Sequence, residues 1–456
     1  MKKILASCLI SLLTFCSLPV QADELMDITR AAGYEVSEVN RPKSTIVIDG
    51  NTGDILWGDN VDEVRDPASM SKVMTLYLTY EAIAQGKFTE DTIVTATASD
   101  QAISGIYAIS NNKIVAGVDY SVSELITMTA VPSSNVTTIM LANLISNNDP
   151  DAFIDLMNTK SQELGMTNTY WFNPSGAAAS AFEGYYNPTR YDIYSANQTT
   201  ARDLAILTYH FVKNYPGILD HTNDAVVTVK AGTPYEETFE TYNYSLPGAE
   251  YGIDGVDGLK TGSSPRGAFN YIATIKRGEQ RHIAVIMGVG DWSDQNGEYY
   301  RHPFGNALIE KSYADYEYKK LLSAGKQTIN GQEYQLEKDF YGTIAKGTEP
   351  TYVVENNQLR VENGLEAVSS MITDTVNVEA ITAQSNSTTS QNSQKTEQVS
   401  KQVDWTTILL GQWPWILLAA LIVSLIGHFF LVQQNNRRKR KQRRNSGERL
   451  SRRNRY

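Results

Sequence analysis

A serine and a lysine stand three positions apart at the head of an apolar run, in "RDPASMSKVMTLYLT" (residues 65–79). Asp66 can cap a helix here and Pro67 suits its first turn, which places Ser69 and Lys72 on one face near the helix N-terminus. A lysine that is desolvated there has a lowered pKa and can take the proton of the serine hydroxyl, while backbone N–H groups at the helix start can hold an oxyanion. The pattern therefore predicts a serine nucleophile with a lysine base.

Two further short motifs follow this pair along the chain. Ser133-Ser134-Asn135 opens the helical pattern "VTTIMLANLI", and Lys260-Thr261-Gly262 follows "GIDGVDGL" just before an expected hairpin. Each motif is weak alone, because Ser-x-x-Lys recurs at residues 323–326 and Ser-x-Asn recurs at Ser110, Ser146 and Ser195. The order Ser-x-x-Lys, Ser-x-Asn, Lys-Thr-Gly is the set found in penicillin-binding proteins and class A β-lactamases. The repeat at residues 323–326 comes after Lys-Thr-Gly and breaks that order.

With these motifs in place, the chain resembles a low-molecular-mass penicillin-binding protein, a serine-type D-Ala-D-Ala carboxypeptidase, over roughly residues 40–315. The longer stretches that carry the resemblance are "VIDGNTGDILWGDNVDEVRDPASMSKVMT", "AFIDLMNTKSQELGMTNTYWFNPSG" and "GIDGVDGLKTGSS". It implies a hydrolase of cell wall biogenesis that removes the terminal D-Ala from peptidoglycan pentapeptide stems, with β-lactams as covalent inhibitors. It implies no metal and no cofactor.

The resemblance also implies roles for the matching residues. Ser69 would be the acylated nucleophile, Lys72 its general base, and Ser133 the relay that passes a proton to the leaving amine. Asn135 would bind the peptide of the substrate, and Lys260 would supply a positive field beside Ser133.

The remaining implied roles concern the two anionic groups of the reaction. Thr261 would help to hold the terminal carboxylate of the substrate, and the backbone N–H groups of Ser69 and Ser263 would form the oxyanion hole. An arginine after the hairpin often assists carboxylate binding in the family. Arg301 in "GEYYRHPF" matches it best, with Arg266 as the rival.

The chain departs from the family pattern at two places. Ser134 stands where the second motif usually has glycine, so that backbone freedom is lost while both flanking side chains are kept. The stretch "NPSGAAASAFEGYYNPTRYDIYSANQTT" carries an apparent insertion that could reshape the rim of a cleft.

Two alternatives to a carboxypeptidase remain open at this point. A β-lactamase would need a base for fast deacylation, and Glu183–Asn187 spells the Glu-x-x-x-Asn pattern of such a base. A non-catalytic cell-wall receptor would keep the fold without the chemistry. Other hydrolases fit poorly, since the chain lacks Gly-x-Ser-x-Gly and His-Glu-x-x-His. Four scattered histidines, without the spacing of metal ligands, are His210, His221, His282 and His302.

The elements that must position these residues follow an α/β order. Residues 44–58 read as two strands around a Gly-rich turn, residues 66–85 as a helix, and "GAFNYIATIKRGEQRHIAVIMGVG" as a hairpin that turns at Gly278. We expect an α/β (α+β) serine β-lactamase/DD-peptidase-like catalytic domain over residues 23–315, with one sheet uniting early and late strands. Short alternating runs over residues 316–383 predict a small all-β domain.

The two ends of the chain indicate export and anchoring. Residues 1–22 read as a signal peptide, and residues 384–407 as a polar flexible linker. Residues 408–432 read as a transmembrane helix, since the twenty residues from Trp413 to Val432 hold no Asp, Glu, Lys or Arg. Twenty helical residues cover about 30 Å. A basic tail over residues 433–456 then predicts a cytoplasmic end, with the catalytic domain outside the cell membrane.

Charge and cysteine content limit which binding partners and which covalent cross-links are expected. The formal charge is −11, and it becomes −23 for residues 23–432 once the tail (+10) and the signal (+2) are set aside. So acidic an exterior argues against nucleic acid, and the basic tail suits anionic membrane lipid. Both cysteines, Cys8 and Cys16, lie in the signal, so the exported protein is expected to have no disulfide.

Overall fold

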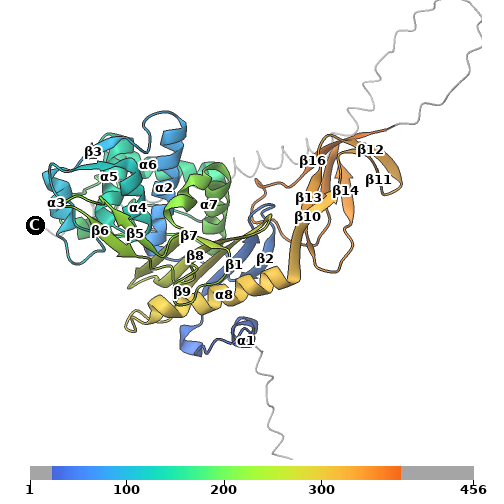
Figure 1. Ribbon diagram of the computed structural model, residues 1–456, viewed down its shortest axis with the longest axis horizontal. Helices are drawn as coiled ribbons and strands as arrows, with labels where there is room; N and C mark the ends of the chain where they lie inside the picture. The colour runs from blue at the N-terminus through green and yellow to red at the C-terminus, as the bar shows by residue number, and fades with distance from the viewer. Residues whose placement is uncertain (1–22, 382–456) are drawn as a thin grey trace, which may run out of the picture. The chain divides into compact units, whose positions relative to one another are not determined.

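The computed structural model describes residues 23–381, and its centre is a five-stranded antiparallel sheet in the order β2-β1-β9-β8-β7 (Figure 1). The strands are β1 (Ser44–Asp49), β2 (Ile55–Asp59), β7 (Val256–Ser264), β8 (Ala268–Arg277) and β9 (Gln280–Val289). The early strand β1 pairs with the late strand β9, with Val47 opposite Ala284. The sheet therefore unites the two ends of the catalytic domain, as the sequence predicts.

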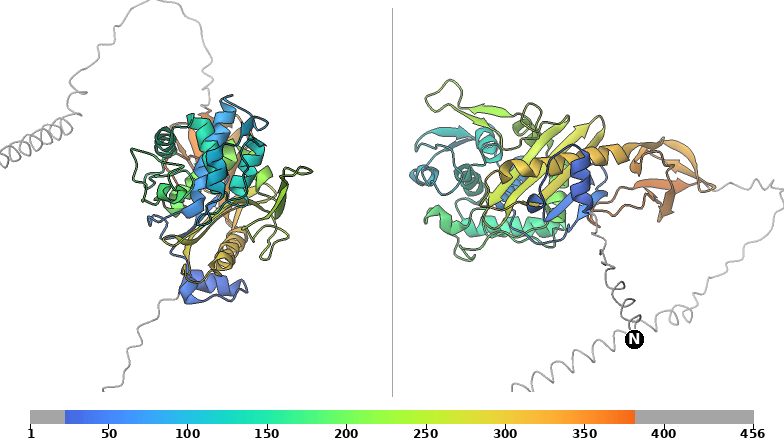
Figure 2. Two further views of the ribbon diagram at one scale, coloured as in Figure 1. Left: turned by 90° about the vertical axis from the view of Figure 1, so that its left-hand side faces the viewer. Right: turned by 90° about the horizontal axis from the view of Figure 1, so that it is seen from below.

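Both faces of this sheet are covered, which explains why β1 is buried along its whole length. Val47, Ala284 and Ile286 pack with Phe304 of α8 on one face. Residues of opposite parity, such as Ile46, belong to the larger core formed with the other helices. Figure 2 shows α8 and the main helical cluster on opposite sides of the sheet. A strand covered on both faces is expected to be continuously apolar, as β1 is at its centre, Ile46–Ile48.

The helical part surrounds a core of aliphatic and aromatic side chains. The helices are α1 (Glu24–Ala31), α2 (Lys72–Ala84), α3 (Ala98–Ser104), α4 (Val122–Ala130), α5 (Asn135–Ser146), α6 (Pro150–Leu164), α7 (Ala201–Asn214) and α8 (Gly297–Asp315). Short 3-10 turns are η1 (Glu38–Asn40), η2 (Ala68–Ser71), η3 (Ala179–Phe182) and η4 (Pro216–His221). Two small hairpins pair β3 (Ile93–Thr95) with β4 (Asp119–Ser121) and β5 (Val226–Val229) with β6 (Glu237–Glu240).

A separate group of strands follows α8 and has its own small apolar core. The strands are β10 (Tyr316–Leu322), β11 (Gly325–Ile329), β12 (Gln332–Leu336), β13 (Phe340–Ala345), β14 (Tyr352–Glu355), β15 (Gln358–Val361) and β16 (Val376–Ala380). β10 pairs with β13, and the other five form a sheet in the order β11-β12-β16-β15-β14. The expected α/β catalytic fold followed by a small β domain is confirmed.

The predictions for the two ends of the chain concern residues that lie outside the described part of the structure. They are the signal peptide (1–22), the linker (384–407), the transmembrane helix (408–432) and the basic tail (433–456). Between residues 23 and 381, no helix combines the length and the apolar character that a membrane span requires.

Candidate active site

Ser69 lies in the 3-10 turn η2, and the α-helix α2 begins only at Lys72. The prediction of a helix from residue 66 was therefore too early at its start. In a 3-10 turn, side chains three positions apart are eclipsed, so this geometry brings the pair closer than an α-helical turn does. Nζ of Lys72 lies 2.9 Å from Oγ of Ser69. Asp66 accepts the N–H of Ala68 at 2.8 Å and so anchors the start of the turn.

Lys72 is fully buried, with 0% exposure, among oxygen acceptors. Its Nζ lies 2.9 Å from Oδ1 of Asn135 and 2.9 Å from the carbonyl oxygen of Ser175. Burial, and then the charge of Lys260, hold the pKa of Lys72 well below its ordinary value. A neutral amine has two N–H groups and one lone pair, which match the two acceptors and the hydroxyl of Ser69. Lys72 is thus positioned to accept the hydroxyl proton of Ser69.

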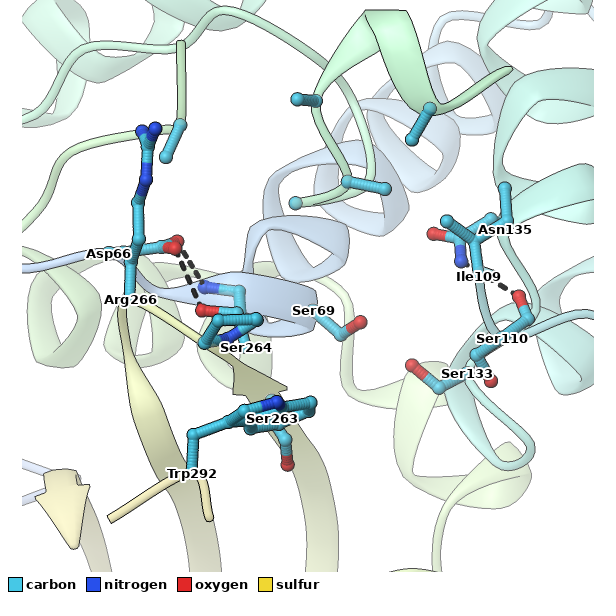
Figure 3. A pocket seen from close by; sticks show the side chains of 18 of the residues that line it. Asp66, Ser69, Ile109, Ser110, Ser133, Asn135, Ser263, Ser264, Arg266 and Trp292 are labelled. Atoms are coloured by element: carbon cyan, nitrogen blue, oxygen red, sulfur yellow. Dashed lines mark hydrogen bonds between the residues drawn. The ribbon is translucent and has the colours of Figure 1, made fainter. Parts of the chain in front are cut away.

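In the second motif, Ser133 has a strained backbone conformation and comes just before α5. Ser133 has a positive φ of 61°, whereas Ser134 has an ordinary φ of −60° and caps the helix by accepting the N–H of Thr137. The position where the family usually has glycine therefore needs no glycine here. Ser133 Oγ is buried and has no hydrogen-bond partner within residues 23–381, and it faces Ser69 across the cleft (Figure 3).

The third motif lies on the edge strand β7, which runs against η2. A Cβ added to Gly262 would lie 2.6 Å from the carbonyl oxygen of Pro67 and 3.0 Å from the backbone nitrogen of Ser69. No side chain fits this contact, so only glycine permits the approach. The close contact places Gly262 against the backbone of Ser69, and Ser263 is the next residue along β7. The backbone N–H groups of Ser69 and Ser263 are the two donors expected to form the oxyanion hole.

Lys260 is a second buried lysine, 2% exposed. Its Nζ has no hydrogen-bond partner in the described part of the chain. Desolvation and the neighbouring charge of Arg301 lower its pKa to about 7, although Glu298 acts in the opposite direction. Lys260 therefore changes its charge near neutral pH, and its amine has unused hydrogen-bond capacity.

The two candidate arginines occupy different surroundings. The Arg301 guanidinium is completely buried, and its Nη1 donates to Oγ of Ser263 at 3.0 Å. Its Nη2 pairs with Glu298, whose side chain borders the cleft. Arg266 is exposed at the rim beside Asp66 and extends away from Ser69 (Figure 3). Arg301 can thus reach a ligand only through its neighbours.

The cleft brings together residues from all three motifs around a cavity of about 590 Å³. The expected site residues on its wall are Ser69, Ser133, Asn135, Thr261 and Ser263. Lys72 and Lys260 lie behind that wall. Trp292 and Tyr242 add aromatic surface near Ser263 (Figure 3 shows Trp292). Glu183, the alternative deacylation base, is exposed on a turn after η3 and does not line this cavity.

Asn135 has both ends of its amide engaged within the protein. Its Oδ1 faces Lys72, while its Nδ2 donates to the carbonyl oxygen of Ser110 at 2.7 Å. The contact visible here is therefore to the base. To bind a substrate peptide as the resemblance implies, Asn135 would have to release the Ser110 carbonyl.

Several positioning residues were missed by the sequence reasoning. Asn197 donates to Oγ of Ser71 at 2.8 Å and to the carbonyl oxygen of Asn173 at 2.9 Å. Asn173 in turn accepts the N–H of Gly176 at 2.6 Å, which fixes the loop that offers the Ser175 carbonyl to the lysine. Asn197 ends one of the repeated Ser-x-Asn matches, and Ser110 begins another. These Ser-x-Asn matches were the only indication of the positioning residues in the sequence, and matches of this kind are also expected by chance.

Within residues 23–381, no cluster of three or more His, Cys, Asp or Glu side chains is arranged to hold a metal ion.

Two family models match the chain. The model described as D-alanyl-D-alanine carboxypeptidase matches residues 33–291, and a domain of unknown function matches residues 318–379. The first covers the sheet and all three motifs. The second covers most of the small β domain.

Curated relatives and solved structures agree with this match. The D-alanyl-D-alanine carboxypeptidase DacF of Bacillus subtilis is 27% identical over 330 residues, covering 72% of this chain and 75% of the relative. DacA of Escherichia coli is 26% identical over 333 residues, covering 70% and 75%. A Streptococcus pneumoniae structure described as a peptidoglycan synthesis regulatory factor (PBP3) has a TM-score of 0.64 at 23% identity, covering 74% of this chain and 98% of that one. Penicillin binding protein 5 of Haemophilus influenzae has a TM-score of 0.59 at 23% identity, covering 76% and 98%.

Proposed function

The chain belongs to the D-alanyl-D-alanine carboxypeptidase family, and from that premise we propose that it removes the terminal D-Ala of peptidoglycan stems through an acyl-enzyme at Ser69. It is a serine-type peptidase of cell wall synthesis. The observation that carries the mechanism is the contact of 2.9 Å between Nζ of Lys72 and Oγ of Ser69. A nucleophile within hydrogen-bond reach of an oriented base is the arrangement that covalent catalysis requires.

Acylation begins when Lys72 takes the hydroxyl proton of Ser69. Oγ then attacks the carbonyl carbon of the penultimate D-Ala, and the carbonyl oxygen becomes an oxyanion held by the N–H groups of Ser69 and Ser263. When the C–N bond breaks, the leaving amine needs a proton. Ser133, whose hydroxyl faces Ser69 and is otherwise unpartnered in the described chain, relays that proton from the lysine side.

Deacylation repeats the same steps with water as the nucleophile. Water attacks the ester carbonyl, Lys72 accepts its proton, and the ester bond to Oγ breaks to restore the Ser69 hydroxyl. The C-terminal carboxylate of the substrate lies at Thr261 and Ser263 in this proposal, within the field of Lys260 and Arg301. β-Lactams would enter the same position and leave a slowly hydrolysed ester.

The β-lactamase and receptor alternatives have weaker support. Rapid penicillin hydrolysis requires an added base, and Glu183 lies off the cleft wall. A receptor without chemistry would have no use for a buried lysine beside a serine. Neither alternative is favoured by an observation of its own.

The decisive experiment is D-alanine release from diacetyl-Lys-D-Ala-D-Ala by residues 23–403, beside the Ser69→Ala variant. We expect release by the parent and none by the variant. Release by both would remove Ser69 from the mechanism. Release by neither would overturn the proposed carboxypeptidase activity, and penicillin turnover would then be measured.

We also propose that the protein is exported and held on the outer side of the cell membrane by residues 408–432. The charge-free run from Trp413 to Val432 and the basic residues after it support this. The test is fractionation of cells that produce the full chain or a chain ending at residue 403. The full chain should be in membranes, and the shortened chain should be released. Equal release of both would contradict the anchor.

A further inference from the structure

The carboxylate of Glu298 contacts Ser263 and Arg301, the groups that the proposed function assigns to binding of the substrate carboxylate. Ser263 Oγ donates to Oε1 of Glu298 at 2.8 Å, and Nη2 of Arg301 pairs with the same carboxylate. Arg301 Nη1 donates to Oγ of Ser263 at 3.0 Å, which closes the triangle. A side chain of the protein thus occupies the place of an anionic ligand.

Access to this triangle is one-sided. Arg301 is 0% exposed, whereas the Glu298 side chain is 26% exposed and borders the cleft. Ser263 borders the same cleft. An anion that enters the cleft therefore meets Glu298 and Ser263 before it meets the arginine.

The Ser263 hydroxyl can donate a hydrogen bond to only one carboxylate at a time. A serine hydroxyl has one hydrogen to donate, and here that hydrogen goes to Glu298. While it does so, Ser263 offers a second carboxylate only lone pairs. Two carboxylates in one low-dielectric site also repel each other. The substrate carboxylate and Glu298 cannot both use Ser263.

We propose that Glu298 is a specificity-determining residue, a resident carboxylate that the C-terminal carboxylate of the substrate must displace. Exchange of one anion for another keeps Arg301 neutralised, whereas a peptide without a free C-terminal carboxylate does not compete for Ser263 and leaves Glu298 in place. The residue thus lowers the affinity for ligands that place a carboxylate at Ser263 and leaves the affinity for ligands without a carboxylate nearly unchanged. This inference rests on the proposed function for the identity of the ligand.

The surrounding structure allows such an exchange. Arg301 also donates to the carbonyl oxygens of Asn270 at 3.3 Å and Tyr242 at 3.4 Å, so its position does not depend on Glu298 alone. The first turn of α8 is fixed because Gly297 packs on Phe269, where an added Cβ would lie 2.0 Å from the ring. Rotation of the Glu298 side chain therefore suffices to free Ser263.

The test measures binding rather than turnover, in the Ser69→Ala background. Calorimetry compares diacetyl-Lys-D-Ala-D-Ala with its C-terminal amide, with and without Glu298→Gln. The work is done at about pH 6, a unit below the pKa of about 7 of Lys260, because loss of Glu298 lowers that pKa further. The control is Glu310→Gln, which removes a carboxylate from the same helix at its ion pair with Arg277.

We expect Glu298→Gln to tighten binding of the acid peptide by about tenfold, as for removal of one close like charge. The amide peptide should change by less than about twofold, and Glu310→Gln should change neither. Glu298→Asp keeps the charge on Arg301 matched but is too short to hold Ser263. Glu298→Asp should therefore tighten binding of the acid peptide by a smaller factor. This variant replaces Glu298→Gln in the test if the Gln variant does not fold.

Unchanged or weaker binding of the acid peptide would overturn the inference and make Glu298 a structural partner of Arg301. Equal tightening of both peptides would overturn it as well, because competition for a carboxylate site cannot affect the amide. Neither result depends on catalysis. D-Alanine release by the parent chain, measured separately, reports on the proposed function alone.

Discussion

The cleft and the junction between the two domains both bury charge, but they treat it in opposite ways. The cleft residues are Lys72, Lys260 and Arg301, and the junction residues are Asp49 and Asp54. At the junction, Asp49 accepts hydrogen bonds from the N–H groups of Asn51 and Thr52 and from the hydroxyl of Thr343 at 2.7 Å. In the cleft, Nζ of Lys260 and Oγ of Ser133 have no partner in the described chain.

This difference separates a structural site from a site built for a ligand. Buried polar groups are normally satisfied, so unused capacity that faces a cavity indicates a missing partner. Thr343 and Asn363 belong to the β domain, and Asn363 donates to Asp54 at 2.9 Å. The junction carboxylates thus bind the two domains together, while Lys260 Nζ and Ser133 Oγ in the cleft have hydrogen-bond capacity left for a substrate.

The comparison is tested most strongly by Lys72→Ala. Loss of a general base costs roughly 10²–10⁴-fold in rate, so acylation of Ser69 by benzylpenicillin should slow by about that factor. The measurement is the rate of covalent adduct formation by mass spectrometry, with circular dichroism to confirm the fold. Adduct formation at the parent rate would contradict the assignment of the base.

A second effect concerns the pH dependence of the cleft. The pKa of Lys260 is lowered to about 7 by burial and by Arg301, so the lysine is charged below that pH and neutral above it. If its charge attracts the substrate carboxylate, kcat/KM should fall by up to about tenfold per pH unit above 7.

The control for this profile is a substrate without a carboxylate at the same position. An amide or ester substrate should lose little kcat/KM above pH 7. An identical alkaline limb for both substrates would show that Lys260 acts on the reaction centre rather than on the carboxylate.

At the junction the expected effect is on stability. Burial raises the pKa of Asp49 from 3.8 to about 6, so its contribution to stability is fully present below about 3.8 and is lost as the pH rises through about 6. Two pKa units correspond to about 3 kcal/mol. Asp49→Asn should remove this part of the pH dependence, as measured by urea unfolding at about pH 4 and 8.

D-Alanine release should be nearly unchanged in Asp49→Asn, because the residue lies outside the cleft. If the unfolding free energies of parent and variant changed with pH in the same way, the pKa of Asp49 would not be raised in the folded protein. A large loss of activity would show instead that the junction and the cleft are coupled.

The smallest effect is expected for Asn197→Ala. The substitution leaves Ser71 and Asn173 without a buried donor, which costs about 1–3 kcal/mol in unfolding free energy. Because the Ser175 loop loses a support, acylation should also slow. Asn363→Ala at the junction is the matched control, with a similar stability loss and an unchanged rate. Equal rates in both variants would remove Asn197 from the positioning of Lys72.

Much of this architecture was predictable because it depends on local patterns. The alternating runs of β8 and β9, with Gly278 at their turn, specify a hairpin, and Ser69 and Lys72 are close because three positions separate them. The order of the motifs predicted which serine is the candidate nucleophile. The short alternating strands after residue 316 predicted the small β domain.

Tertiary structure alone decided which distant groups complete the cleft. The Ser175 carbonyl reaches Lys72 from 103 positions away, Asn197 reaches Ser71 from 126, and Ser263 reaches Glu298 from 35. No periodicity in the sequence encodes such contacts, because they depend on how β7, α8 and the loops pack around η2. The sequence by itself predicted the candidate nucleophile and its base, because three positions separate them, and packing determined the acceptors, the positive field and the Glu298 carboxylate that surround them.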